Sequence, residues 1–320
     1  MNMSGHSGLK VTKKKTGLSA FFLEMHKNKT LYLMIVPALV FVIIFNFMPL
    51  YGLQLAFRKF NFQLGIMGSP WVGLDNFLIY FKSIFFFQTT YNTLFLNFLF
   101  ITFGTLSAVT VAILLNETRR GKQKVYQTFM FFPHFISWIV ISAFVTALLA
   151  DRFGLLNQVI RYFGGEGAVW FREPKYWPTI LTIAHVWQSL GVSSVIYLAK
   201  IASIDQEIYE ASTIDGANKF QEIMLITLPM IVPTIVLLTL IAIGGIFRGN
   251  FGMIYALTEG KGALLSVTEV IDTYVFRMMR LTGNYGMAAA VGLYQSIMGF
   301  LLVMLSNFLV KRYDKELALF

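Results

Sequence analysis

The sequence contains no cysteine and few charged residues. Asp, Glu, Lys and Arg together make up only 13% of its 320 residues. The absence of thiols excludes disulfides, thiolate metal sites and cysteine nucleophiles. A soluble domain usually has about a quarter charged residues. Because 56% of this chain is hydrophobic, its surface cannot all face water, and the composition indicates a membrane protein.

Motifs for enzymatic chemistry are missing as well. The sequence has no G-x-x-x-x-G-K-[ST], H-E-x-x-H or G-x-S-x-G, and "LTEGKGALL" lacks the first glycine and the hydroxyl of a phosphate-binding loop. Four histidines lie far apart. His134 is expected to pack near a membrane interface, whereas His185 lies deep in an apolar run, where it is either functional or a neutral hydrogen-bonding group. We therefore expect no catalytic residue, metal site or cofactor in this chain.

Six apolar windows are long enough to cross a membrane. A transmembrane helix needs about 20 largely apolar residues, and none of the windows contains Asp, Glu, Lys or Arg. They predict an all-α membrane protein with six transmembrane helices. The windows are Leu31–Leu50, Tyr91–Leu115, Thr128–Ala150, Pro178–Ala199, Pro229–Phe247 and Met287–Val310.

The basic clusters predict the orientation of these helices. "KKK", "RRGKQK" and "KRYDK" all fall on the side of the N-terminus, and cytoplasmic loops carry the excess of Lys and Arg. We therefore expect a multi-pass plasma-membrane protein with cytoplasmic tails at 1–30 and 311–320. Residues 31–90 would form the first helix and an external loop, and 91–310 the core. The net charge of +10 is explained by this bias, so we expect no nucleic-acid partner.

A polar segment, "EASTIDGANKF", interrupts the apolar sequence between the fourth and fifth windows. Ser203–Gln206 fits a capping box that starts a helix. Gly216 is typical of a helix stop or a left-handed turn, and a second helix can follow from Ala217. The pattern predicts a helix-turn-helix over about 203–228 on the cytoplasmic side.

This segment resembles the EAA motif of binding-protein-dependent ABC importer permeases. Ser212 stands where a second alanine is more usual. The matching positions are Glu210, Ala211, Asp215, Gly216, Ala217, Leu228 and Pro229. Other stretches, such as "SPWVGLDNF" and "NTLFLN", resemble the oligosaccharide and polysaccharide permeases of Gram-positive bacteria. The resemblance implies the type I ABC importer transmembrane fold.

The resemblance also implies a set of partners. A second homologous permease would complete a heterodimer, and two cytoplasmic ATPase subunits would bind ATP-Mg. An extracellular solute-binding lipoprotein would deliver a carbohydrate. The EAA segment would be a coupling helix that docks in a cleft of the ATPase.

The resulting prediction is the permease subunit of an ATP-driven carbohydrate importer. An ion-coupled secondary sugar carrier is the main alternative, but such carriers commonly keep a carboxylate in the membrane, and the six windows have none. An intramembrane enzyme lacks the necessary residue sets. Candidate sugar contacts, chosen for aromatic faces or hydrogen bonding, are Trp187, Gln188, Asn250, Tyr274 and Gln295. Each of them is alternatively a packing or interhelical contact.

Overall fold

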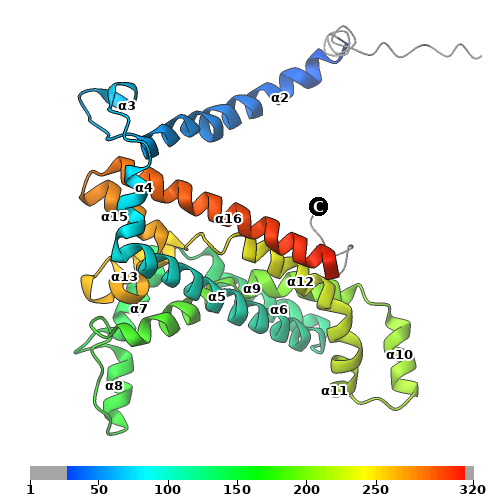
Figure 1. Ribbon diagram of the computed structural model, residues 1–320. Helices are drawn as coiled ribbons and strands as arrows, with labels where there is room; N and C mark the ends of the chain where they lie inside the picture. Colours follow the sequence, from blue (N-terminus) through cyan, green and yellow to red (C-terminus); the bar gives the residue numbers. More distant parts are fainter. Residues whose placement is uncertain (1–26, 314–320) are drawn as a thin grey trace, which may run out of the picture. The chain divides into compact units, whose positions relative to one another are not determined.

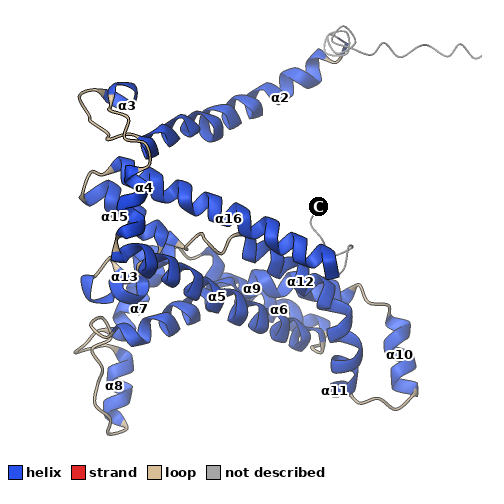
Figure 2. Ribbon diagram, in the orientation of Figure 1, coloured by secondary structure: helices blue, strands red, loops and turns tan. Residues whose placement is uncertain are grey.

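The computed structural model describes residues 27–313, and their secondary structure is helical, with loops between the helices (Figures 1 and 2). The described part of the chain divides into two units, with the boundary between Leu53 and Gln54. Of the predicted tails, residues 1–26 and 314–320 lie outside the described residues, and so does the "KKK" cluster at Lys13–Lys15.

The first unit contains most of one long apolar helix, whose last residues, up to Phe57, belong to the second unit. It begins with α2 (Lys29–Val42), continues through a π-helical turn at Ile43–Phe47 and passes into a 3₁₀ segment, Met48–Phe57. Pro49 has no backbone N–H to donate, and a π-helical turn is one way to accommodate such a loss inside a helix. No residue of α2 or of the π-helical turn is buried, which suits a helix surrounded by lipid or by other subunits.

The second unit is a bundle of helices of very different lengths. Its helices are α3 (Gly65–Gly68), α4 (Asp75–Lys82), α5 (Ile84–Asn116), α6 (Arg120–Phe131), α7 (Trp138–Leu149), α8 (Leu155–Tyr162), α9 (Trp177–Ala202), α10 (Gln206–Ile214), α11 (Lys219–Glu222), α12 (Leu228–Gly244), α13 (Phe251–Thr258), α14 (Leu265–Thr268), α15 (Ile271–Leu281) and α16 (Tyr285–Tyr313).

Among the described residues, five helices are long and apolar enough to cross a membrane. They are Lys29–Phe57, Ile84–Asn116, Pro174–Ala202, Lys219–Gly244 and Tyr285–Arg312. A sixth crossing results only if the bent pair Gly121–Phe135 and Trp138–Leu149 is counted as one span. The prediction of six long apolar segments is therefore matched by five continuous helices and one broken one.

The broken segment corresponds to the predicted window Thr128–Ala150. Its two parts meet at 96°. A 3₁₀ turn containing Pro133 ends the first part, and Ile136 and Ser137 then have extended backbone. The Ser137 hydroxyl accepts a hydrogen bond from the Val140 N–H at 3.5 Å and caps α7. Because a new helix starts here, the window is not the straight helix that its hydropathy alone predicts.

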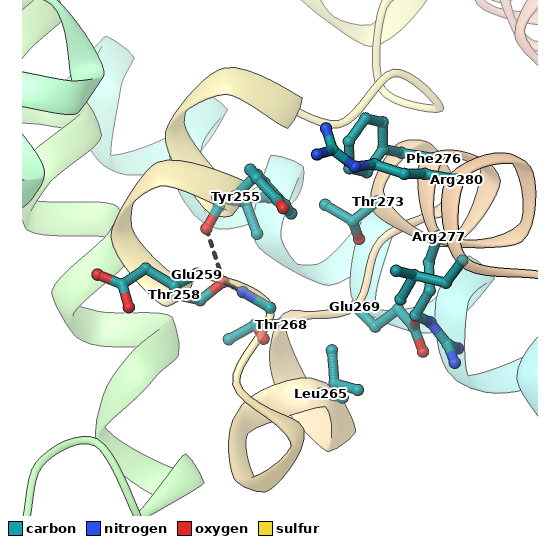
Figure 3. A pocket seen from close by; sticks show the side chains of 13 residues that line it. Tyr255, Thr258, Glu259, Leu265, Thr268, Glu269, Thr273, Phe276, Arg277 and Arg280 are labelled. Carbon is teal, nitrogen blue, oxygen red and sulfur yellow. Dashed lines mark hydrogen bonds and ion pairs between the residues drawn. The ribbon is translucent and has the colours of Figure 1, made fainter.

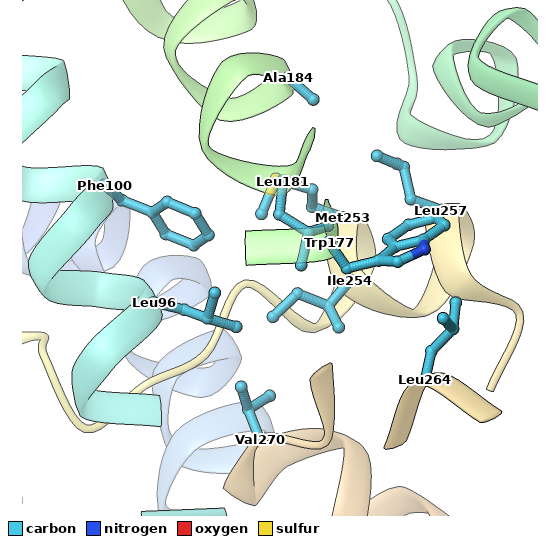
Figure 4. Close-up of a cluster of buried hydrophobic side chains, with 10 residues drawn as sticks. All are labelled: Leu96, Phe100, Trp177, Leu181, Ala184, Met253, Ile254, Leu257, Leu264 and Val270. Carbon is cyan, nitrogen blue, oxygen red and sulfur yellow. The ribbon is translucent and has the colours of Figure 1, made fainter. Parts of the chain in front are cut away.

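The bundle is built around the long pair α5 and α9. Near one end, Leu96 and Phe100 of α5 and Trp177 of α9 pack with Met253 and Leu257 of α13 (Figure 4). Trp177 is fully buried, and its indole N–H donates to the Trp170 carbonyl at 2.8 Å. This cluster seats the short helices α13 and α14 on the bundle.

A second cluster lies toward the other ends of α5 and α9. It joins Ala108 and Ala112 of α5 with Tyr197 and Ile201 of α9 and Ile231 of α12. The C-terminal end of α9 and the start of α12 are therefore fixed in one packed layer, and the polar segment α10–α11 projects between them (Figure 1).

Gly191 allows α9 to approach the end of α6 closely. A Cβ atom at this position would overlap the carbonyl group of Met130 and the amide nitrogen of Phe131. Only glycine fits without a backbone shift. The contact lies next to the break at Ile136 and Ser137, where Gln188 Nε2 also donates to the Ile136 carbonyl at 3.4 Å.

Candidate coupling segment and substrate path

The polar segment begins with a capped helix. α10 starts after Asp205, whose carboxylate accepts the Glu207 N–H at 3.1 Å. The predicted cap, Ser203, instead follows the last residue of α9, and its hydroxyl donates to the Lys200 carbonyl at 2.7 Å. The prediction of a Ser203–Gln206 capping box is wrong because α9 extends through Ala202 and uses Ser203 at its own end.

A left-handed turn at Gly216 ends α10. Its φ is +83°, which confirms the conformation expected from the sequence. The Gly216 N–H donates to the Thr213 carbonyl at 3.1 Å, and the Ala217 N–H donates to the Ser212 carbonyl at 3.0 Å. These bonds use carbonyls that a helix end otherwise leaves unpaired.

The chain then enters α11 through a capping box that sequence reasoning missed. The Asn218 side chain accepts the Gln221 N–H at 3.0 Å, and the Gln221 side chain accepts the Asn218 N–H at 2.9 Å. Asn218 and Gln221 have the three-residue spacing of this motif, so the signal was present in the sequence. The turn therefore has a defined structure on both sides.

A buried carboxylate joins the two helices of this hairpin. Glu222 of α11 is 3% exposed. Its Oε1 accepts bonds from the hydroxyls of Ser212 at 3.4 Å and Thr213 at 3.2 Å, both on α10, and its Oε2 pairs with Lys219 Nζ at 2.5 Å. Tyr209 adds a second link, because its hydroxyl lies 2.9 Å from the Thr227 hydroxyl.

Helix continues without interruption from α11 into α12. A π-helical turn, Ile223–Thr227, joins them, so one helix runs from Lys219 to Gly244. The predicted end of the second helix near residue 228 is wrong. Pro229 is the second residue of α12, and the π-helical turn just before α12 accommodates its missing N–H. A displacement of the hairpin can therefore pass directly into a membrane helix.

The surface of the hairpin combines acidic and apolar side chains. Glu207 and Glu210 are exposed on α10. Ile214 is 86% exposed and Phe220 71% exposed, and Ile208 of α10 is 38% exposed. Ala211 and Asp215 are exposed as well, whereas Ser212 and Ala217 are half-buried. The surface can complement a cleft that has basic edges and an apolar floor.

The predicted sugar contacts do not form one cluster. Trp187 is 46% exposed and lines an apolar cavity between α7 and α9, and Gln188 binds the break in the α6–α7 segment, as described above. Asn250 caps α13 by accepting the Met253 N–H at 3.1 Å. Tyr274 is 1% exposed, within an aromatic cluster. Gln295 donates to the Phe247 carbonyl at 2.6 Å.

Gln295 and Asn250 do lie near one another, at the linker that follows α12. Asp272 Oδ2 accepts the Gly249 N–H at 2.5 Å and the Gln295 side chain at 2.9 Å. Asn97 of α5 donates to the Ile246 and Arg248 carbonyls at 2.9 and 3.2 Å. Burial raises the pKa of Asp272, although these hydrogen bonds oppose the shift. The side chains satisfy backbone groups that the end of α12 leaves free.

His185 packs against an aromatic ring. Its ring stacks on Phe100 with centroids 4.5 Å apart, and its Nδ1 is buried without a hydrogen-bond partner among the described residues. Within residues 27–313, no group of three or more acidic, His or Cys side chains could hold a metal ion. The contact with Phe100 gives His185 a packing role.

Comparison with known proteins places the chain in a family. Residues 101–315 match the family described as "Binding-protein-dependent transport system inner membrane component". Protein LplB of Bacillus subtilis (strain 168) is 33% identical over 91% of this chain and 92% of its own length. The polygalacturonan/rhamnogalacturonan transport system permease protein YteP of the same organism is 34% identical over 95% of this chain and 94% of its own length.

Solved structures agree with this assignment. A chain of a bacterial alginate ABC transporter, in complex with an alginate pentasaccharide-bound periplasmic protein, has a TM-score of 0.82 at 30% identity over 92% of this chain and 98% of that chain. A chain from a bacterial ABC transporter involved in alginate import has a TM-score of 0.84 at 30% identity over 92% of this chain and 99% of that chain. The predicted fold class is confirmed.

These likenesses define a membrane permease of the ABC importer class. The chain belongs to the family of binding-protein-dependent transport system inner membrane components. An ion-coupled secondary carrier, the alternative considered from the sequence, is therefore set aside.

Proposed function

We propose that this chain forms the translocation path of an ATP-driven importer for oligosaccharides, together with a second, homologous permease subunit. The main support for the proposal is the α10–α11 hairpin. It is exposed, its two helices are joined by hydrogen bonds to Glu222, and it is continuous with the membrane helix that ends at Gly244. The choice of a carbohydrate as the substrate is based on the names of related proteins. YteP is named for polygalacturonan and rhamnogalacturonan, and the MalF protein of Thermococcus litoralis, 29% identical, for trehalose and maltose.

Two separate ATPase subunits would bind ATP-Mg and receive the hairpin. The exposed carboxylates of Glu207 and Glu210 would meet basic residues of the ATPase, and Ile214 and Phe220 would enter an apolar part of its cleft. Buried apolar side chains at the centre and charges at the rim are the usual arrangement of such interfaces. This chain would have no ATPase activity of its own, because its sequence has no phosphate-binding loop.

Closure of the ATPases would move the membrane helices through the hairpin. On one side, the short connection Ser203–Asp205 ties α10 to α9; on the other, the π-helical turn Ile223–Thr227 ties α11 to α12. The Glu222 bonds hold α10 and α11 together, so that α9 and α12 would shift as a unit. Trp187 and Gln188 lie on α9 near the α6–α7 break, where such a shift would change the lining of the path.

The hairpin would be cytoplasmic, and so would both termini. The segment after α12, including α13–α15, would then face outward, because it follows the opposite end of α12. A solute-binding lipoprotein would deliver the carbohydrate at this outer face. In this arrangement Asn250, Tyr274 and Gln295 lie near the delivery side of the path, and their contact with sugar stays a prediction.

Uptake by vesicles tests the proposal. The complete importer is reconstituted into proteoliposomes with the binding protein outside, and the uptake of radiolabelled tetragalacturonate and maltotetraose is measured. ATP enclosed in the vesicles is expected to drive uptake of at least one sugar, and sodium or proton gradients without ATP are expected to drive none. Uptake that follows an ion gradient, or that needs no partner subunit, would contradict the proposal.

A further inference from the structure

A small pocket lies among α13, α14 and α15, in the segment that connects α12 to α16. Its volume is about 260 Å³. Its wall includes aromatic, hydroxyl and charged side chains from all three helices (Figure 3). The lining includes Tyr255, Thr258, Glu269, Phe276, Arg277 and Arg280. None of them belongs to the coupling hairpin.

The pocket and the hairpin lie at opposite ends of α12. The hairpin precedes Leu228, the first residue of this helix, and the pocket segment begins after Gly244, its last residue. Figure 1 shows α10 and α11 well separated from α13 and α15. If the hairpin meets the ATPase, as proposed above, the pocket lies on the side where the binding protein releases sugar.

Aromatic rings form one part of the wall. The rings of Tyr255 and Phe276 meet edge to face with centroids 5.0 Å apart, and Phe251 stacks on Tyr255 at 5.3 Å. Tyr255 is 39% exposed. Aromatic side chains offer a large, rigid apolar surface, on which the C–H face of a pyranose ring can lie. The Thr258 hydroxyl donates to the Ile254 carbonyl at 2.8 Å and accepts the Gly260 N–H at 3.4 Å, so this buried group holds the backbone of the wall in place.

A buried ion pair forms another part of the pocket wall. Arg277 Nε donates to Glu269 Oε1 at 2.6 Å, and Glu269 is 1% exposed. The remaining oxygen of Glu269 and Nη2 of Arg277 are buried and have no partner among the described residues. Burial raises the pKa of Glu269, although Arg277 opposes this. Buried polar groups are rarely left unpaired. A small outward movement of these two side chains would let their unpaired atoms form hydrogen bonds with a ligand.

Of the two arginines that line the pocket, Arg280 is the one with no carboxylate partner among the described residues. Glu269 is matched by Arg277, and Glu259 by Lys261 at 3.4 Å. Arg280 makes no ion pair within residues 27–313; its guanidinium lies over the Phe276 ring, 5.7 Å from the centroid. An exposed guanidinium beside an aromatic face is suited to bind a carboxylate through two parallel hydrogen bonds.

We propose that this pocket binds one carboxylate-bearing sugar unit of the transported oligosaccharide, with its ring on Phe276 and Tyr255 and its carboxylate on Arg280. This rests on the proposed carbohydrate transport. A single ring is the occupant that fits, because the pocket is smaller than the roughly 300–1,000 Å³ of sites for drug-sized ligands. The remaining units of the chain extend outward past the exposed Arg280 and Leu281.

The absence of cysteine gives a direct test on the full-length chain in detergent. Leu281 lines the pocket and is 74% exposed, so Leu281→Cys introduces the only thiol at its rim. The rate of its reaction with a small maleimide is measured against the concentration of tetragalacturonate or of neutral maltotetraose. Tetragalacturonate is expected to slow labelling at lower concentrations than maltotetraose. Ile214→Cys, on the hairpin, is the control thiol, and its labelling is expected to stay constant.

Substitution of Arg280 then tests whether its positive charge causes the preference for the acidic sugar. Arg280→Gln is expected to raise the tetragalacturonate concentration for half-protection by about tenfold, as the loss of a charge-assisted hydrogen bond predicts. Arg280→Lys should keep part of the preference. Arg172→Gln, at an exposed arginine outside the pocket, should change nothing.

Two results would overturn the proposal: equal protection by the acidic and the neutral sugar, or undiminished protection in Arg280→Gln. ATP-driven uptake distinguishes this failure from failure of the proposed function. If tetragalacturonate or maltotetraose still enters vesicles with ATP while Leu281→Cys shows no preference, the transport function stands and the pocket assignment is wrong.

Discussion

Replacement of Gly216 by valine tests how the coupling hairpin depends on its turn. Gly216 has φ +83°, and a Cβ atom built at this position has no neighbour within 4 Å. The cost of a side chain is therefore conformational and not steric. An L-residue in the left-handed region costs about 1–2 kcal/mol, and a β-branched residue is at the upper end of that range.

A penalty of about 2 kcal/mol lowers the population of the correctly turned hairpin about 30-fold relative to opened forms. The Gly216–Thr213 and Ala217–Ser212 backbone bonds would be lost in those forms. The membrane helices do not depend on the turn, so the protein should still insert. We therefore expect Gly216→Val to keep normal membrane levels, but to lose ATPase co-purification and uptake.

Gly216→Asn is the matched control, because asparagine adopts the left-handed conformation more readily than other residues with a side chain. It should retain most of the binding and uptake. Both variants and the native chain are solubilised together with their partners, and the recovered ATPase subunit is quantified. Normal ATPase recovery and uptake with Gly216→Val would refute the role given to this turn.

Three further predictions concern other parts of the chain. Gly191→Ala should destabilise the protein in detergent by about 1–3 kcal/mol because its Cβ meets the backbone of α6. Gly104→Ala, whose Cβ has no neighbour within 4 Å, should be neutral or stabilising by up to about 1 kcal/mol. Unfolding by SDS titration would compare the two variants. Burial raises the pKa of Asp272, so the folded state favours the protonated carboxyl, and the free energy of unfolding falls as the pH rises through this raised pKa. Asp272→Asn, which cannot ionise, should therefore be more stable than the native chain at pH 8 but not at pH 4. An equal difference at both pH values would contradict this. Glu210→Lys reverses an exposed charge and should reduce ATPase recovery without loss of membrane insertion, as quantitative immunoblots of membranes and pull-downs can check.

The long membrane helices were predictable because a span needs about 20 apolar residues in sequence, and such runs are visible without any tertiary information. The break within 128–150 was not. It depends on the extended backbone of Ile136 and Ser137 and on the close approach of α9 at Gly191. A hydropathy window averages over these local features, so it cannot separate a straight span from a bent one.

The coupling segment was predictable in outline but not in its internal bonds. Gly216 marks the turn because few other residues accept its conformation. Ser203 and Asp205 are both good N-caps two residues apart, and only the length of α9 decides between them. Glu222 joins Ser212 and Thr213 across the turn, a contact that depends on how α10 and α11 fold together. The pocket of Tyr255, Glu269 and Arg280 likewise forms only when three short helices pack.

The most direct test of the account is a cross-link from the hairpin to the ATPase. Ile214→Cys places a single thiol on an 86% exposed position of α10, and Phe153→Cys places one on an 81% exposed position between α7 and α8, away from the hairpin. Each variant of the complete importer is labelled with a photoactivatable maleimide and irradiated, and the captured subunits are identified by mass spectrometry while uptake is measured. We predict that Ile214→Cys captures the ATPase subunit and that uptake stops on cross-linking, whereas Phe153→Cys captures no ATPase. Efficient labelling of Ile214→Cys without ATPase capture, in an importer that still transports with ATP, would contradict the claim that this hairpin couples ATP hydrolysis to import.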